Sequence, residues 1–217
     1  QAYARIHLGD RDLDKRFVLS LKQLGAQPEA SPHKACGTAS QSKALYRLVA
    51  NEKLTDKSIV NIHHDVTMER IRESGASVVL VSQDTTEINY SSLKNTTGLG
   101  CIGTNPKLRG FIAHSAIAVS PQGEVLGLLD QEIWKREPEE RGKKKNRAVL
   151  PIEEKESYKW LRCMRHSQLG CPENIRLIHL SDREGDVYEY FEAAQLEECQ
   201  FICRRVQNRM VQETERT

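Results

Sequence analysis

Two short runs of β-forming residues, each followed by an aspartate, constrain the fold of this chain more than any other feature. The first run leads from Ser77 to Asp84, and the second leads from Ile175 to Asp182. Valine, isoleucine and leucine dominate both runs, which is typical of strands buried in a sheet. A single aspartate after a strand often only forms a turn or caps the next helix. Two carboxylates at neighbouring strand ends instead indicate a site for a divalent metal such as Mg²⁺, which prefers hard oxygen ligands.

Length and composition indicate a soluble globular protein. A chain of 217 residues can hold one sizeable core, with or without a small helical module. No run approaches the roughly 18 apolar residues of a membrane span, and the first residues lack the apolar core of a signal peptide. We therefore expect a cytoplasmic protein with no membrane partner. Because the chain begins at Gln1 and has a polar ending at Thr217, we expect it to be a fragment of a longer product.

The six cysteines do not form a recognisable framework. No C-x-x-C pair or zinc-ligand spacing is present, and a disulfide scaffold is a poor fit to a chain of this length. Cys199 and Cys203 flank Phe201 in a run typical of a strand, so we expect them to be buried thiols. The adjacent pair His63 and His64 falls on an expected helix, where neighbours do not share a face, so it is not a paired metal site.

Positive charge is concentrated in one stretch, although the net charge is only +2. Residues 135–147 contain seven of the 32 lysines and arginines of the chain, together with one proline and one glycine. Such a run is usually a solvated loop. The alternative is a mobile basic loop that meets a phosphate backbone.

Apolar residues at helical spacing predict three helices between residues 10 and 74. The first carries Leu13, Phe17, Leu21 and Leu24 and stops at Gly25 and Pro28. We expect Ser40 to cap the second helix and Thr55 to cap the third, which closes at Gly75. Residues 1–75 are therefore predicted to form a small all-helical module.

After residue 75 the pattern changes to strands and predicts an α/β domain over residues 76–217. The expected elements are strands at 78–83, 111–120 and 125–134, a helix at 152–168, a strand at 175–181, a helix at 186–196 and a strand at 200–204. A helical crossover lets the strand at 175–181 lie parallel to the first strand. Asp84 and Asp182 then converge at the carboxyl ends of two strands, where open α/β sheets bind ligands. The order β-β-β-α-β-α-β is that of a ribonuclease H-like mixed sheet.

Short motifs along most of the chain carry a resemblance to a known family. They are Leu8-Gly9-Asp10 with Arg16, Tyr46-Arg47, Asp84-Thr85-Thr86 with Tyr90, His114-Ser115, Gly127-Leu128-Leu129 with Gln131-Glu132 and Trp134, Glu154-Lys155-Glu156-Ser157 with Lys159-Trp160-Leu161, and Asp182-Arg183-Glu184 with Asp186. In order and spacing they resemble the DDE transposases of bacterial insertion sequences. The resemblance is to the IS-four group, which includes the transposase of transposon Tn five.

The resemblance implies a cut-and-paste DNA transposase that acts by metal-dependent DNA cleavage and strand transfer. It implies that Asp84 and Asp182 are the first two metal-binding catalytic carboxylates, with Mg²⁺ as cofactor and Mn²⁺ as a substitute. The implied partners are double-stranded DNA, both transposon ends and target, and a second copy in the synaptic complex of the full-length protein. The implied location is on DNA in a bacterial cytoplasm.

The third catalytic glutamate of this family is not present in this chain. In the family it lies in a Tyr, Arg, Glu, Lys motif after a β-rich insertion, which here would begin near Arg205. Residues 76–217 are thus expected to be a catalytic core truncated before that insertion. Glu184 and Asp186 are alternative ligands, but a glutamate at a helix start more simply complements the helix dipole. We expect the isolated chain to cleave DNA poorly or not at all.

The resemblance makes residues 1–75 the module that binds the transposon end. Arg16, Lys43 and Arg47 are our candidates for phosphate or base contacts, because cationic side chains on helices supply both. Lys107 and Arg109 flank the second expected strand and are candidates for a DNA channel. For each of these five, the alternative is a solvated surface charge.

Two other functions compete with an active transposase. One is a catalytically inactive DNA-binding relic or a truncated inhibitor of transposition, which keeps the helical module and lacks the third carboxylate. The other is a general ribonuclease H-like nuclease, which explains the strands but not the helical module.

Overall fold

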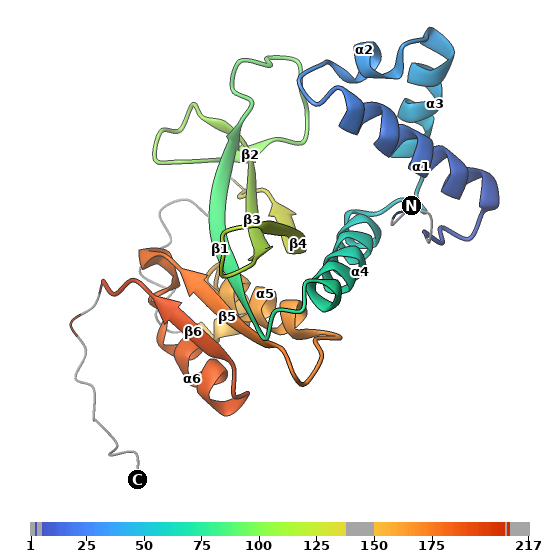
Figure 1. Ribbon diagram of the computed structural model, residues 1–217. Helices are drawn as coiled ribbons and strands as arrows, with labels where there is room; N and C mark the ends of the chain where they lie inside the picture. Colours follow the sequence, from blue (N-terminus) through green and yellow to red (C-terminus); the bar gives the residue numbers. More distant parts are fainter. Residues whose placement is uncertain (1–2, 4–5, 138–149, 207, 209–217) are drawn as a thin grey trace. The chain divides into compact units, whose positions relative to one another are not determined.

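The computed structural model describes residues 3, 6–137, 150–206 and 208 (Figure 1). The chain divides into two compact units, residues 1–66 and 67–217, which are described separately. The functional division at residue 75, into a DNA-binding and a catalytic domain, stays a prediction. Within the described residues, no helix is long and apolar enough to cross a membrane.

The first unit is built from helices. They are α1 (Arg11–Ala26), α2 (Pro32–Cys36), α3 (Ala39–Val49) and the first part of α4 (Asp56–Glu73). Asp10 caps α1, because its Oδ1 accepts hydrogen bonds from the amides of Asp12 at 2.9 Å and Leu13 at 3.3 Å. Phe17 and Leu48 are buried in the core of this unit. The helical spacing of the apolar residues predicted α1 correctly.

The caps of the later helices agree only in part with the prediction. The hydroxyl of Thr55 accepts a hydrogen bond from the amide of Ser58 at 3.0 Å, as expected for the start of α4. The prediction that Ser40 caps α3 is wrong. Thr38 caps this helix by accepting from the amide of Gln41 at 3.2 Å, because the turn at Gly37 places Thr38 in extended backbone just before the first helical residue.

The second unit contains a mixed sheet of six strands (Figure 1). The strands are β1 (Val78–Asn89), β2 (Gly100–Cys101), β3 (Arg109–Val119), β4 (Val125–Trp134), β5 (Arg176–Ser181) and β6 (Gln200–Cys203). Their order is β2-β3-β1-β5-β6, and β4 also pairs with β3. The pairs formed by β3 are antiparallel, whereas β1 with β5 and β5 with β6 are parallel. The mixed α/β class is confirmed, and the ribonuclease H-like assignment stays a prediction.

The last turns of α4 and four further helices among the described residues complete this unit. The four are η4 (Ile152–Glu154), α5 (Tyr158–Gln168), η5 (Arg183–Gly185) and α6 (Tyr188–Leu196). Helix α5 is the crossover that allows β5 to run parallel to β1. Cys199 and Cys203 are free thiols, but they are only partly buried rather than buried as expected, because within the described residues β6 pairs only with β5.

The first strand is longer than its sequence suggests. We predicted a strand that stops at Gln83, but β1 continues to Asn89. The prediction that Asp84 ends its strand is therefore wrong. Beyond Ser82, where pairing with β5 stops, β1 continues to pair with β3, and this second partner keeps the polar segment extended.

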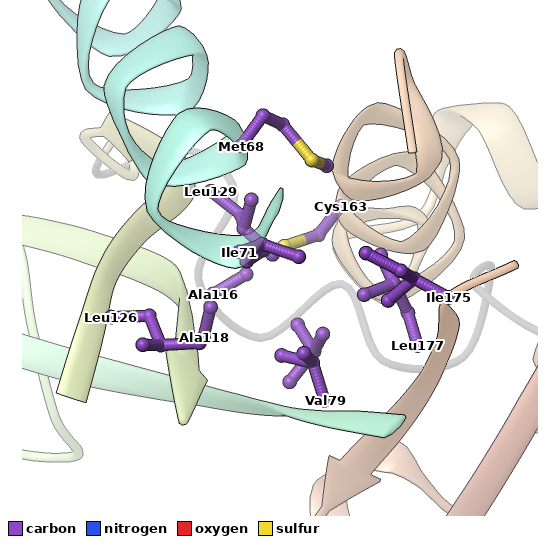
Figure 2. Close-up of a cluster of buried hydrophobic side chains, with 11 residues drawn as sticks. Met68, Ile71, Val79, Ala116, Ala118, Leu126, Leu129, Cys163, Ile175 and Leu177 are labelled. Carbon is purple, nitrogen blue, oxygen red and sulfur yellow. The ribbon is translucent and has the colours of Figure 1, made fainter. Parts of the chain in front are cut away.

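The two faces of the sheet differ in how they are covered. Val79 and Val81 point to one face, where they pack with Met68 and Ile71 of α4 and with Cys163 of α5 (Figure 2). We call this the covered face. The alternate residues form the open face, where several large apolar side chains remain exposed: Ile117 39%, Val125 71%, Ile133 45% and Ile202 62%. The sheet therefore presents one face to solvent or to a ligand.

The close approach of β1 and β3 near their ends requires glycine at position 110. A Cβ added at Gly110 would overlap the carbonyl oxygen of Ile88. We expect Gly110→Ala to lower the free energy of unfolding by about 2–4 kcal/mol, measured by chemical denaturation, because backbone on the paired strand must move. Gly25→Ala is the control, since a Cβ there meets nothing within 4 Å and lies in helix α1. Equal effects of the two substitutions would contradict the close approach.

Candidate functional site

The parallel pairing of β1 with β5 places Asp84 and Asp182 level with each other. Ser82 of β1 is paired with Leu180 of β5. Asp84 and Asp182 each follow their paired residue by two positions, and paired strands lie roughly 5 Å apart. The two residues that the sequence singled out are about a hundred positions apart in the chain. Both follow the last residues paired between β1 and β5, at the same end of this parallel pair.

Both aspartates are exposed. Asp84 lies on the open face, as does Ser82 two residues before it. Asp182 is the first residue after β5 and caps η5, since its Oδ1 accepts a hydrogen bond from the amide of Glu184 at 2.8 Å. Asp84 is held by a continuous strand, whereas Asp182 is held by a turn.

Two polar residues on the open face adjoin Asp84, and the sequence reasoning did not single them out. Ser115 of β3 is paired with Asp84 across the strands. Gln131 of β4 is paired with Ser115 and donates a hydrogen bond to its hydroxyl at 2.9 Å. The signal available in the sequence was the presence of polar residues inside otherwise apolar strands. Both belong to the motifs that carry the family resemblance.

The donor chemistry of the aspartate pair fits Mg²⁺ when a phosphate supplies further oxygens. Mg²⁺ is usually bound by one or two carboxylates, several waters and substrate phosphates rather than by a complete protein cage. In the part of the chain that the structure describes, no group of three or more His, Cys, Asp or Glu residues is arranged to hold a metal ion.

Both residues considered as a replacement third ligand already have partners in the structure. Glu184 Oε2 accepts a hydrogen bond from Lys159 Nζ at 3.4 Å. Asp186 Oδ2 accepts a hydrogen bond from the amide of Val206 at 2.7 Å. Both side chains instead stabilise the turn that follows β5.

Behind Asp84, on the covered face, runs a chain of buried hydrogen bonds that we call the polar chain. It links Gln168 to His179 (3.2 Å), His179 to Gln83 (3.0 Å), Gln83 to His114 (3.2 Å) and His114 to Thr85 (2.9 Å). The polar chain thus joins α5, β5, β1 and β3. Its members Gln83 and Thr85 are the two neighbours of Asp84.

Burial keeps both histidines of the polar chain neutral. Burial, with help from Lys159 and Arg162, lowers the pKa of His114 to about 3. Burial lowers the pKa of His179 to about 4. A neutral His114 donates from Nε2 to Gln83 Oε1 and accepts at Nδ1 from the Thr85 hydroxyl, whereas an imidazolium only donates. At His179 both partner atoms are amide nitrogens, so a neutral imidazole accepts a hydrogen bond from one of them.

This arrangement predicts a loss of stability in mild acid. The histidines have a pKa near 6.5 in the unfolded chain. Their contribution to the free energy of unfolding is therefore complete above that pH, and it falls as the pH drops toward the pKa values of the folded protein. Between pH 7.5 and pH 5, we expect the free energy of unfolding to fall by about 2 kcal/mol for each histidine. Chemical denaturation at the two pH values measures this fall.

A variant isolates the contribution of one histidine. His179→Gln should be less stable than the parent at pH 7.5, because hydrogen bonds are broken. Between pH 7.5 and pH 5, however, its free energy of unfolding should fall by about 2 kcal/mol less than that of the parent. His33→Gln, at an exposed position, should keep the full fall. An unchanged fall in His179→Gln would show that this residue does not titrate as inferred.

Three of the predicted DNA contacts lie in the first unit. Lys43 and Arg47 are exposed and, being four residues apart on α3, share one face of the helix. Tyr46 beside them is 59% exposed, which is unusual for an aromatic side chain. Arg16 lies on α1 and is partly buried. The exposed side of α3 is therefore the strongest candidate surface of this unit.

The two predicted contacts in the second unit lie away from the aspartates. Lys107 and Arg109 are exposed, but Arg109 begins β3 six residues before Ser115, the partner of Asp84. Six strand residues span about 20 Å. The guanidinium of Arg109 donates to the carbonyl of Leu99 at 3.1 Å. The structure thus does not bring these cations to Asp84, and their contact with DNA stays a prediction.

Most of the basic stretch at 135–147 lies outside the described residues, which stop at 137 and resume at 150. Its first two cations are paired. Lys135 contacts Glu137 at 2.7 Å. Arg136 forms ion pairs with Glu156 at 2.6 Å and Glu87 at 3.0 Å, and these partners raise the pKa of the guanidinium.

Residues 1–54 match the family model described as transposase DNA-binding. This segment covers α1 to α3, including Arg16, Lys43 and Arg47. The match supports DNA as the partner of this segment and a transposase as the class of protein.

Comparison with solved structures gives a weaker result. A chain of the pre-cleavage Mos1 transpososome is similar at 8% identity with a TM-score of 0.27, which is too low to support an argument about function. The similarity covers 84% of the present chain and 57% of that chain. No curated protein sequence matches.

Proposed function

We propose that this chain is part of a cut-and-paste DNA transposase of the DDE class, related to the IS-four group. Residues 1–75 bind the transposon end, and residues 76–217 supply two catalytic carboxylates of a ribonuclease H-like core. The observation that carries the proposal is the match of residues 1–54 to transposase DNA-binding domains. The level placement of Asp84 and Asp182 supports the catalytic part.

The proposed chemistry is in-line displacement at phosphorus. Mg²⁺, or Mn²⁺ in its place, activates the attacking oxygen and stabilises the leaving one when it is bound. Asp84 and Asp182 would hold the ion, while Ser115 and Gln131 fix the surface beside Asp84. The open face gives a DNA strand access to these residues. Water attacks in the nicking step, and a DNA 3′ hydroxyl attacks in strand transfer.

The second candidate is a catalytically inactive DNA-binding relic or a truncated inhibitor of transposition. It is favoured by the lack of a three-ligand metal group among the described residues. A ribonuclease H-like nuclease unrelated to transposition does not explain the match of residues 1–54. The proposed transposase acts as a homodimer in its synaptic complex, in a bacterial cytoplasm.

The DNA-binding role predicts a salt-dependent loss in variants of α3. Arg47→Ala and Lys43→Ala should each weaken binding of the chain to transposon-end DNA and reduce the slope of log K against log salt by about 1, because each removes one phosphate contact. Fluorescence anisotropy over a range of salt concentrations measures this slope. Lys57→Ala, an exposed cation of α4 that is not a candidate, should leave it unchanged. Equal slopes for all variants and the parent would remove α3 from the interface.

The catalytic role predicts separation of cleavage from binding. In the full-length protein, Asp84→Asn should abolish Mg²⁺-dependent cleavage of transposon-end DNA and leave DNA binding unchanged, since the substitution removes a charged ligand on the open face of the sheet. Gel analysis of cleaved ends measures the first effect and anisotropy the second. The matched control is Asp65→Asn on α4, which should cleave at the parental rate. Cleavage at the parental rate by Asp84→Asn would disprove the assignment of Asp84.

A further inference from the structure

We propose that Lys159 is a positioning residue, which fixes the turn that carries Asp182 by holding Glu184. The inference rests on the proposed metal-binding role of Asp182 and deepens it. It assigns a role to Glu184, the acid nearest to Asp182 in sequence, as a tether rather than a ligand.

Lys159 is buried far more deeply than is usual for a lysine. It lies in the first turn of α5 and is only 6% exposed. Its ammonium lies 5.7 Å from the ring centre of Trp134 and 5.8 Å from that of Trp160. Burying a charged group is costly unless it is paired, so the partners of this ammonium are structurally important.

Those partners lead directly to the turn after β5. The ammonium of Lys159 lies 3.4 Å from Glu184 Oε2 and 3.9 Å from Glu156 Oε1. Glu156 is in turn held by two hydrogen bonds from Arg136, at 2.8 Å and 2.6 Å. The ion pair with Glu184 therefore attaches the turn to Lys159 on α5, whose ammonium is also held by Glu156.

Glu184 passes this constraint on to Asp182. Its amide donates the 2.8 Å hydrogen bond to Asp182 Oδ1, so the residue is held through its side chain and orients the aspartate through its backbone. The underside of the turn is equally constrained. A Cβ added at Gly185 would lie 2.5 Å from the Cβ of Ser181 and 3.5 Å from the ring of Trp160. The turn thus rests on Trp160 on one side and is tied by Lys159 on the other.

The positioning role and a purely electrostatic role predict opposite results. Lys159 is a positive charge near a proposed cation site, so its removal would strengthen Mn²⁺ binding if charge were its only effect. If Lys159 holds the turn, its removal lets Asp182 leave its position and weakens Mn²⁺ binding. If Glu184 were itself a ligand, freeing it from Lys159 would also strengthen binding. The sign of the change distinguishes positioning from both alternatives.

The first experiment measures Mn²⁺ binding to the chain by the loss of the electron paramagnetic resonance signal of free Mn²⁺. Lys159→Met should raise the dissociation constant by about fivefold, a usual coupling between contacting residues, and Lys159→Arg should restore it to within about twofold. Lys155→Met is the matched control, because Lys155 is a partly buried neighbour whose 3.1 Å ion pair is with Glu189 of α6. It should leave the dissociation constant unchanged. Tighter or unchanged binding in Lys159→Met would overturn the proposal.

A second readout needs no metal. In the nuclear magnetic resonance spectrum of the metal-free chain, the amide proton of Glu184 should move upfield in Lys159→Met, because its hydrogen bond to Asp182 is weakened. The amide of Val79, at the far end of the parallel pair, should not move, which separates a local change from general loss of structure. An unmoved Glu184 amide would overturn the tether.

Two further variants separate the failure of this inference from failure of the proposed function. Asp84→Asn and Asp182→Asn should each abolish Mn²⁺ binding. If neither does, the proposed metal site is wrong, and the ion pair between Lys159 and Glu184 is then tested by the Glu184 amide shift alone. If Lys159→Met does not fold, Lys159→Gln breaks the same ion pair with a neutral polar side chain and should give the same upfield shift of the Glu184 amide and the same fivefold loss.

Discussion

The parallel pairing of β1 with β5 is the constraint on which the candidate site depends. Its register places Ser82 opposite Leu180 and so brings Asp84 level with Asp182. A slip of one residue would turn every side chain of a strand to the opposite face. Asp84 would then point into the helices of the covered face, where an unpaired carboxylate is costly. A site made from two distant residues is therefore only as precise as the register of these two strands.

Apolar packing alone does not explain that register, because valine and leucine side chains repack easily after a slip. The polar chain is more selective. His179 of β5, Gln83 of β1 and His114 of β3 each find a specific partner at 3.0–3.2 Å, and all three are fully buried. A slip would leave their polar atoms without partners, at a cost of about 1–3 kcal/mol for each group. The same hydrogen bonds that fix the register are made by Gln83 and Thr85, the two neighbours of Asp84. They therefore both stabilise the sheet and fix the position of Asp84.

Local patterns in the sequence predicted the features that depend on local physics. The helical spacing of Leu13, Phe17 and Leu21 predicted α1, and the turn before Val125 with the strand-like run that follows it to Trp134 predicted the bounds of β4. The length of β1 was missed, because the segment after Gln83 is polar and becomes a strand only by pairing with β3. The tether from Lys159 to Glu184 joins residues 25 positions apart. No periodicity reports such a contact, although the motif that contains Lys159 and Trp160 was visible in the sequence.

Charge pairing around the site explains why Asp84 and Asp182 stand out among many acids. Glu87, Glu156 and Glu184 are each paired with Arg136 or Lys159, so that acids and bases alternate from β1 through α5 to the turn after β5. Neighbouring acids that are neutralised in this way add little to the local potential. Within the described residues, Asp84 and Asp182 form no ion pair, and both are exposed. In the proposed function, these two carboxylates would attract a cation, and a cation held there would give the nearby surface an affinity for phosphate.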